Sequence, residues 1–167
     1  MMGSGKSTVG RLLAERLEWP YHDNDLLLVN GEGQTARQLL AARGDAGLLA
    51  AEVGALRRAL ALPVPNIVGV AARAILDPQT REALRDAGLV AWLRVTPETV
   101  RQRAVGAAHR PWPADDPLPW LRAAVRERDP LYASVADLAL DADAHAPELL
   151  GDAIAAAVTD RGCCPDD

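Results

Sequence analysis

Phenylalanine is absent from this sequence of 167 residues, and aromatic residues together make up only 4% of it. A hydrophobic core must therefore be aliphatic, and 49% of the residues are hydrophobic, which is enough for one domain of this length. The sequence also lacks a signal peptide and any apolar run long enough to cross a bilayer. These absences predict a soluble, cytoplasmic protein that does not contact membranes.

Positive charges are fewer than negative ones, with 18 lysine and arginine residues against 23 aspartate and glutamate residues. The formal net charge is −5, so the protein has no overall electrostatic attraction to nucleic acid. Lysine occurs once, as Lys6, whereas arginine is found throughout the chain. A compact ammonium can reach between phosphate groups where a planar guanidinium does not fit. Any phosphate chemistry is therefore expected to be local and to centre on Lys6.

Hydrophobic patterning predicts helices that alternate with short strands. This alternation is typical of a three-layer α/β fold, in which helices flank a parallel sheet. The predicted helices cover residues 6–18, three segments within 24–61, and residues 77–88, 96–105, 120–135 (interrupted at Pro130) and 147–159. The predicted strands cover residues 21–22, 66–70, 89–95 and 136–140.

No repeat or linker divides the chain, so residues 1–160 are predicted to form a single domain. Residues 107–119 hold four prolines and little periodicity, which predicts a loop. Residues 161–167 are expected to be a disordered tail. The tail contains two adjacent cysteines without metal-binding spacing, Cys163 and Cys164, which are interpreted as free thiols.

The strongest motif is a phosphate loop that opens the first helix. Glycines let backbone N–H groups approach phosphate oxygens, and the start of a helix attracts an anion. In such loops the lysine bridges the β- and γ-phosphates of ATP, and the serine binds Mg²⁺. The residues expected to bind ATP here are Gly3, Ser4, Gly5, Lys6, Ser7 and Thr8.

The loop matches only the end of the full GxxxxGK[ST] motif, which normally follows a strand. The first glycine and the strand would fall before residue 1, so the first strand is interpreted as truncated. A misassigned start codon, with about ten residues missing upstream, is the favoured explanation. A broken gene product is the alternative.

Two carboxylates, Asp23 and Asp25, follow the predicted strand at residues 21–22. At positions i and i+2 of an extended or turning segment, both side chains can point into one cleft. One carboxylate could then organise Mg²⁺ while the other orients a hydroxyl or accepts its proton. A solvated turn that caps a helix is the alternative interpretation.

Several motifs follow one another from residue 3 to about 150 with the spacing of one family: GSGKSTVGRLLAERL, DND, GQT, ILDPQTREAL, HRPW and RERDPLYASVADLALD. In these motifs the chain resembles the shikimate kinases. The resemblance implies a P-loop NTPase fold of the nucleoside-monophosphate-kinase type, with a lid at about residues 107–119. It also implies ATP-dependent phosphorylation of the 3-hydroxyl of shikimate, with ATP and Mg²⁺ as cofactors.

The resemblance also assigns roles to individual residues. It implies Lys6, Asp25 and Arg110 as catalytic residues, with Arg110 in the lid, and Asp23 with Ser7 at the metal. Arg103 and Pro147 match residues of the adenine pocket. Arg128 matches an arginine that pairs with the shikimate carboxylate, for which a guanidinium fork is suited.

The acceptor half departs from the family pattern. Leu49 stands where the family has a second arginine that grips the carboxylate, and Ala71 and Ala72 replace glycines. One lost charge-assisted hydrogen bond costs about 1.5–3 kcal/mol, or roughly tenfold or more in affinity. Arg73 follows these alanines, and we hypothesise that it binds the substrate in place of the lost arginine. His145 replaces a basic residue near the nucleotide pocket.

These departures leave two alternatives to a shikimate kinase open. One is a kinase of the same fold that acts on a different small polyol or sugar acid. The other is a catalytically degenerate nucleotide-binding module. In each case the expected partner is a small molecule, and the protein is expected to be a monomer.

Overall fold

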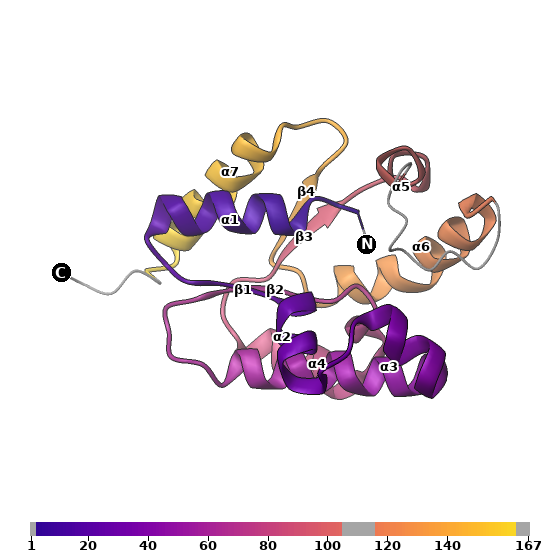
Figure 1. Ribbon diagram of the computed structural model, residues 1–167. Coiled ribbons are helices and arrows are strands. Elements are labelled where there is room, and N and C mark those ends of the chain that lie inside the picture. The colour runs from indigo at the N-terminus through magenta and orange to yellow at the C-terminus, as the bar shows by residue number, and fades with distance from the viewer. Residues whose placement is uncertain (1–2, 105–115, 163–167) are drawn as a thin grey trace.

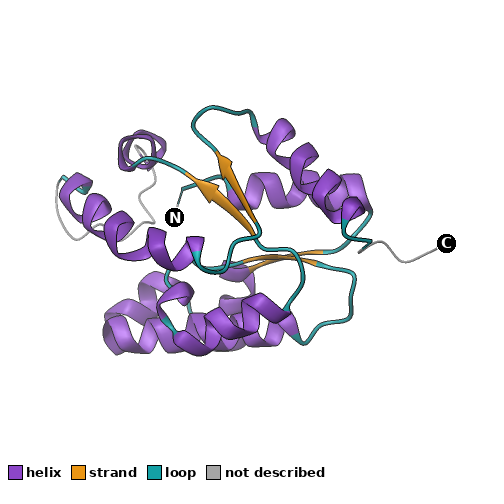
Figure 2. Ribbon diagram, turned by 180° about the vertical axis from the view of Figure 1, so that it is seen from behind, coloured by secondary structure: helices purple, strands orange, loops and turns teal. Residues whose placement is uncertain are grey.

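The computed structural model describes residues 3–104 and 116–162, in which short parallel strands lie between two layers of helices (Figure 1; Figure 2). One layer contains α1 and α7, and the other contains α2, α3 and α4. In chain order the elements are α1 (Lys6–Leu17), β1 (Tyr21–Asp23), α2 (Asn24–Glu32), α3 (Ala36–Leu60), β2 (Ile67–Gly69), η1 (Ala74–Leu76), α4 (Pro78–Asp86), β3 (Ala91–Arg94), α5 (Pro97–Ala104), α6 (Leu118–Ala133), β4 (Leu138–Asp141) and α7 (Pro147–Asp160).

Helix α1 begins after Gly5 and packs along α7. Its buried side chains recur at helical spacing, with Val9 and Leu13 facing Leu150 and Ile154 of α7 in one hydrophobic cluster. At its end Glu18 adopts a left-handed conformation with φ 57°, and its N–H bonds the carbonyl of residue 14. The predicted helix over residues 6–18 is confirmed.

Helices α2 and α3 form the opposite layer. Leu28 and Leu39 are completely buried where the two helices meet. Thr35 and Gln38 cap α3 reciprocally, each side chain accepting a backbone N–H of the other residue. Gly44 interrupts α3 with φ 66° and ψ −170°, so the stretch contains three helical segments, as predicted.

The four described strands are all parallel to their partners, but they form two separate pairs. β1 pairs with β2, and β3 pairs with β4. The predicted parallel strands are confirmed. A single continuous sheet is not seen, because no strand of the described residues lies between β2 and β3.

The region around α6 differs from the prediction in two details. The helix begins at Leu118, two residues earlier than expected, and continues through Pro130. Proline has no backbone N–H, so the helix lacks one hydrogen bond at Pro130. The lost bond lies near the end of α6, where the N–H of Ser134 still bonds the Pro130 carbonyl at 3.1 Å. Residues 105–115, which include most of the predicted lid at 107–119, lie outside the described residues, as do residues 163–167 of the predicted tail.

Among the described residues, no helix combines the length and the apolar character needed to span a membrane.

Candidate active site

The loop before α1 has the backbone geometry of an anion site. Gly3 and Gly5 have φ values of 76° and 91°, which side chains with a Cβ rarely adopt. No side chain caps the start of α1, so its first N–H groups are available to a ligand. The Ser4 side chain is 2% exposed, and its Oγ has no hydrogen-bond partner among the described residues. These features fit a bound phosphate.

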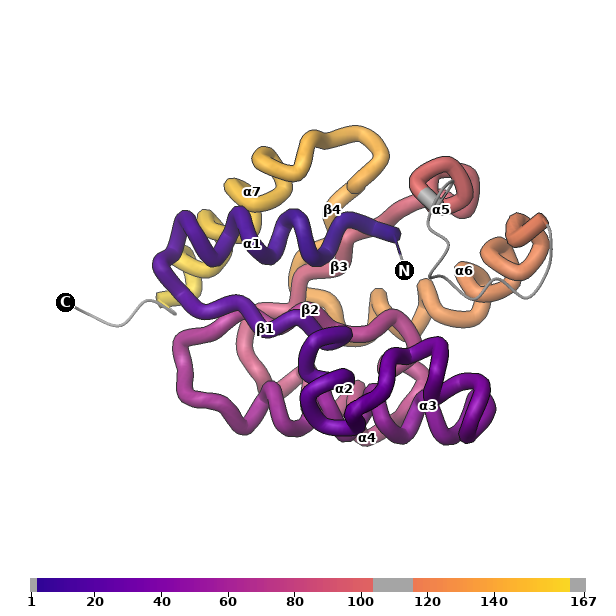
Figure 3. Tube along the Cα trace, in the orientation of Figure 1, coloured from indigo at the N-terminus to yellow at the C-terminus, as the bar shows by residue number. Residues whose placement is uncertain are grey.

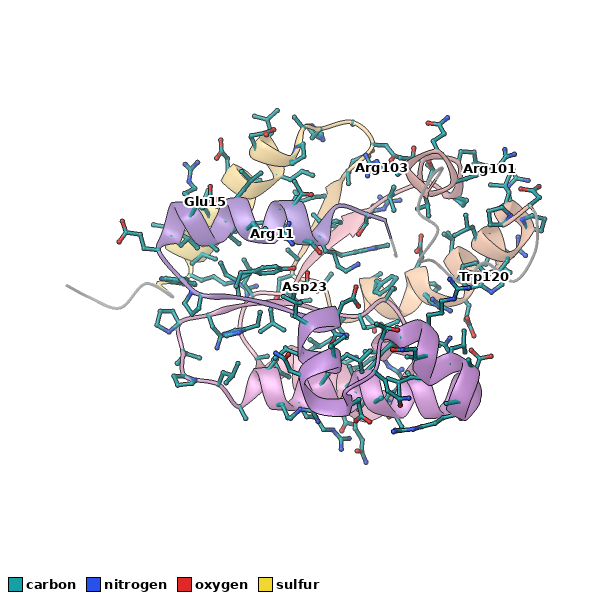
Figure 4. The ribbon with its side chains drawn as sticks, viewed as in Figure 1. Arg11, Glu15, Asp23, Arg101, Arg103 and Trp120 are labelled. Atoms are coloured by element: carbon teal, nitrogen blue, oxygen red, sulfur yellow. The ribbon has the colours of Figure 1, made fainter. Side chains whose placement is uncertain are left out.

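Ser7 and Asp23, the two predicted metal residues, are in direct contact. Ser7 Oγ donates a hydrogen bond of 2.7 Å to Asp23 Oδ2, and the Tyr21 hydroxyl donates one of 3.2 Å to the same oxygen. Figure 4 shows Asp23 beneath α1. Burial would raise the pKa of Asp23, but the hydrogen bonds from Ser7, from the backbone of Asp25 and from Tyr21 lower it. A hydroxyl beside an ionised carboxylate is a donor set that suits Mg²⁺.

Asp23 also caps α2, which agrees with the helix-cap interpretation of this segment. Its Oδ1 accepts the N–H of Asp25 at 2.9 Å. This cap fixes Asp25 in the first turn of α2, where its side chain is exposed. Tyr21 was not predicted to be part of the site, and burial raises the pKa of its hydroxyl to about 12.

Helix α3 carries a buried carboxylate, Glu52, whose pKa is affected by several predicted catalytic and acceptor residues. Its side chain is 8% exposed, and Oε2 has no hydrogen-bond partner among the described residues. Burial raises the pKa of Glu52 to about 7, although Arg73 opposes that rise. Asp25 raises it further, and Arg128 and Lys6 lower it. Charged residues from four separate parts of the chain therefore affect the pKa of one carboxyl group.

Sequence patterning did not identify Glu52. The available signal was a single acidic residue in an otherwise apolar helical stretch of leucine and alanine, residues 48–56. An acidic residue on the buried face of a helix is rare unless it has a partner or a function.

Replacing Glu52 with glutamine is expected to remove a pH dependence of stability. The carboxyl titrates near pH 4.5 when unfolded and near 7 when folded, so the folded state holds more protons between these values. The contribution of this carboxyl group to the free energy of unfolding is therefore full below pH 4.5. It falls by at most about 3 kcal/mol as the pH rises through 7. Urea unfolding from pH 4.5 to 8 should show this loss in the wild type and not in Glu52→Gln. The exposed Glu82→Gln variant is the control, and parallel curves for wild type and Glu52→Gln would contradict the expectation.

Arg73 makes its described contacts with Asp45. Nη1 lies 2.7 Å from Asp45 Oδ1, and Nη2 donates to the Asp45 carbonyl at 3.2 Å. Asp45 itself is 79% exposed and follows the break at Gly44. The Nε atom of Arg73 is buried and has no hydrogen-bond partner among the described residues. The terminal nitrogens of Arg73 are thus held by an ion pair with Asp45 that solvent weakens.

Arg128 on α6 is 7% exposed. Its guanidinium lies over the Trp120 ring, 5.9 Å from the centroid, and Nε is 3.6 Å from Glu127 Oε2 without a hydrogen bond. One turn further along α6, the Tyr132 hydroxyl donates a bond of 2.6 Å to the carbonyl of Ala72. Tyr132 therefore supports the altered turn that precedes Arg73.

A second group of predicted residues lines a cavity of about 240 Å³ next to the phosphate loop. Arg103 borders it and bonds the carbonyls of Ala142 at 2.9 Å and of Gly3 at 3.4 Å, which ties α5 to the loop (Figure 4). The His145 ring, with Nδ1 3.0 Å from the Asp141 carbonyl oxygen, forms another part of the wall. Predicted ATP-binding residues in the lining are Ser4, Gly5, Thr8, Arg103 and Pro147. Arg110 lies outside the described residues.

Comparison with known proteins decides the family. The shikimate kinase family profile matches residues 2–160. The chain belongs to the shikimate kinase family. Shikimate kinase from Symbiobacterium thermophilum is 40% identical over 146 residues, which cover 86% of this chain and 83% of that protein. The Geobacter metallireducens shikimate kinase is 38% identical over 141 residues, covering 84% and 78%.

Solved shikimate kinases share the fold. A structure of the Acinetobacter baumannii enzyme in complex with shikimate has a TM-score of 0.88 at 28% identity, and the match covers 96% of this chain and 89% of that one. The chain is accordingly a small-molecule kinase with a P-loop fold, and its family uses ATP as phosphate donor. The resemblance noted in the motifs is confirmed over nearly the whole described chain.

Proposed function

We propose that this shikimate kinase family member transfers the γ-phosphate of ATP to the 3-hydroxyl of shikimate, forming shikimate 3-phosphate and ADP. The observation that carries the proposal is the uncapped phosphate loop, whose Ser7 hydroxyl bonds the strand-end carboxylate of Asp23. The A. baumannii relative, solved with shikimate, supports the choice of acceptor.

On the donor side, the loop amides and Lys6 hold the β- and γ-phosphates of ATP, and the cavity beside Arg103 and Pro147 receives adenine. Ser7 and Asp23 hold Mg²⁺, which neutralises charge on the phosphates. Arg110, outside the described residues, is proposed to reach the γ-phosphate during transfer.

On the acceptor side, Asp25 orients the attacking hydroxyl and accepts its proton. Arg128 pairs with the substrate carboxylate, and Arg73 turns from Asp45 to supply the second guanidinium. The Arg73–Asp45 pair is weak enough to exchange, because Asp45 is 79% exposed. We propose that the protein works as a monomer in the cytoplasm without a nucleic-acid partner, in line with its net charge of −5.

A coupled ADP-release assay tests the proposal. The chain is supplied with ATP, Mg²⁺ and one acceptor at a time from a panel of shikimate, sugar acids, polyols and cyclitols without a carboxylate. The proposal expects turnover with shikimate, and loss of that turnover when EDTA removes Mg²⁺. Product identity is checked by phosphorus NMR. ADP release that is unchanged by any acceptor would contradict it.

A second candidate is a kinase for a small polyol that lacks the carboxylate. The observation that favours it is Leu49, which packs in a hydrophobic cluster where a second carboxylate-binding arginine is expected, while the Arg73 terminal nitrogens already bond Asp45. In the same panel, a higher kcat/KM for a neutral cyclitol than for shikimate would establish this alternative.

Replacing Arg73 with leucine is expected to raise the KM for shikimate about tenfold, because one charge-assisted hydrogen bond to the carboxylate is lost. kcat should change little, since the carboxylate is remote from the reacting oxygen. Steady-state kinetics with shikimate varied at saturating ATP measure KM and kcat separately. Arg57→Leu, an exposed arginine on α3 that bonds Gln79, is the matched control. Equal KM values for Arg73→Leu and Arg57→Leu would exclude Arg73 from acceptor binding.

A further inference from the structure

The half-buried ring of Tyr21 is held between helix α1 and strand β2. Helix α1 lies along the pair β1 and β2, as the ribbon and the tube show (Figure 1; Figure 3). On one side the ring packs against Gly10 of α1, where an added Cβ would collide with ring carbons. On the other side its hydroxyl faces Gly69 of β2, where an added Cβ would lie 2.5 Å from the oxygen. Two glycines therefore leave the space that fixes the position of the hydroxyl.

Helical and strand spacing bring this ring beside the predicted metal residues. Ser7 and Gly10 are three positions apart on α1, and Tyr21 and Asp23 are two positions apart on β1, so the members of each pair share a face. Ser7 bonds Asp23 at 2.7 Å, and Gly10 contacts the Tyr21 ring. Because Gly10 has no side chain, α1 can approach β1 closely enough for both contacts to form.

The Asp23 carboxylate accepts hydrogen bonds at both oxygens. Oδ1 accepts the N–H of Asp25, and Oδ2 accepts the hydroxyls of Ser7 and Tyr21. A carboxylate turns readily about its last side-chain bond, because that torsion has only broad minima. At Oδ2, the Tyr21 hydroxyl is the donor that does not come from α1. It restrains the carboxylate independently of how the phosphate loop and its ligand move.

We propose that Tyr21 is a positioning residue for the Mg²⁺ site, whose hydroxyl fixes the Asp23 carboxylate so that Ser7 stays oriented toward the nucleotide phosphates. The inference rests on the proposed roles of Ser7 and Asp23 at the metal. While the Ser7 hydroxyl donates its proton to Asp23, the lone pairs of its oxygen remain available to a cation. Tyr21 acts through Asp23 and is not a metal ligand itself.

Calorimetric titration with ADP tests this role without turnover. The Kd for ADP is measured with EDTA and with Mg²⁺, and the first value divided by the second is the Mg²⁺ enhancement. Tyr21→Phe keeps the ring and removes the hydroxyl. It is expected to lower the enhancement about threefold and to leave the Kd in EDTA unchanged, because a bond of 3.2 Å is longer than most O–H···O bonds. Thr159→Val, which removes a hydroxyl that bonds the Ala155 carbonyl within α7, is the control and should change neither value.

Two further variants identify the route of the effect. Asp23→Asn keeps a good cap for α2, and adding Tyr21→Phe to it should not lower the Mg²⁺ enhancement further. Gly69→Ala places a methyl group against the Tyr21 hydroxyl and should lower the enhancement as Tyr21→Phe does. Combined with Tyr21→Phe, it should add nothing. Gly69→Ala also tests the role separately if removal of the hydroxyl weakens folding, which Tm measures on each preparation.

The outcomes separate this role from the proposed phosphotransfer. An unchanged Mg²⁺ enhancement in Tyr21→Phe would overturn the positioning role and leave the phosphotransfer intact. Equal weakening of ADP binding with and without Mg²⁺ would also overturn it, because a packing defect would explain that result. A further loss on adding Tyr21→Phe to Asp23→Asn would refute the route through Asp23. A wild type without any Mg²⁺ enhancement would remove the metal assignment of Ser7 and Asp23, and the role of Tyr21 with it.

Discussion

Replacing Lys6 with alanine is expected to lower kcat by about 10³-fold or more. Lys6 is the only lysine in the sequence and begins α1, where the uncapped N–H groups point at the same anion. Backbone amides can still bind the phosphates without it. The charge that develops on the transferred phosphoryl group would lose its nearest ammonium, and no other lysine is present to replace it.

The measurement is ADP release at saturating ATP and shikimate, with Tm determined on the same preparations. Lys6→Arg serves as the charge-matched variant. It is expected to be nearly as inactive as Lys6→Ala, because the planar fork does not fit between phosphates. Activity within tenfold of the wild type in a folded Lys6→Ala protein would refute phosphoryl transfer through this loop.

Sequence patterns predicted the elements whose structure is determined by residues close together in the chain. The helix after Gly5 follows from apolar residues at helical spacing, and Asp77 with Pro78 marks the start of α4, where the Asp77 carboxylate accepts the Thr80 N–H at 2.7 Å. Three helical segments were predicted within residues 24–61, and the kink that separates the last two lies at Gly44, whose φ of 66° glycine tolerates. The family resemblance assigned both Ser7 and Asp23 to the metal, and their side chains are in contact in the structure.

Features that depend on tertiary packing were missed. Glu52 lies inside a long helix, and helical patterning gives no sign that its carboxyl group differs from others. Its burial, and the effects of Arg73 and Arg128 on its pKa, arise only once α3 is packed in the fold. Arg73 was expected in the acceptor site, but its ion pair with Asp45 joins residues 28 positions apart and has no local signature. The division of the strands into the pairs β1–β2 and β3–β4 also depends on the whole fold, because local patterning does not say which strands pair.

The acceptor side leads to the second large effect: Asp25→Asn is expected to lower kcat by about 10²–10⁴-fold, since the amide cannot accept the proton of the attacking hydroxyl. The cap from Asp23 should keep α2 in place, because it binds the backbone N–H of residue 25 and not its side chain.

Removing the charge of Asp25 also removes one cause of the raised pKa of Glu52, so the titration of Glu52 should move to lower pH in the variant. The pH profile of kcat and the carboxyl NMR titration of Glu52 measure the two effects separately. Asp86→Asn, an exposed aspartate at the end of α4, should change neither. A shifted Glu52 titration with wild-type kcat would leave Asp25 beside the acceptor site but exclude it as the base.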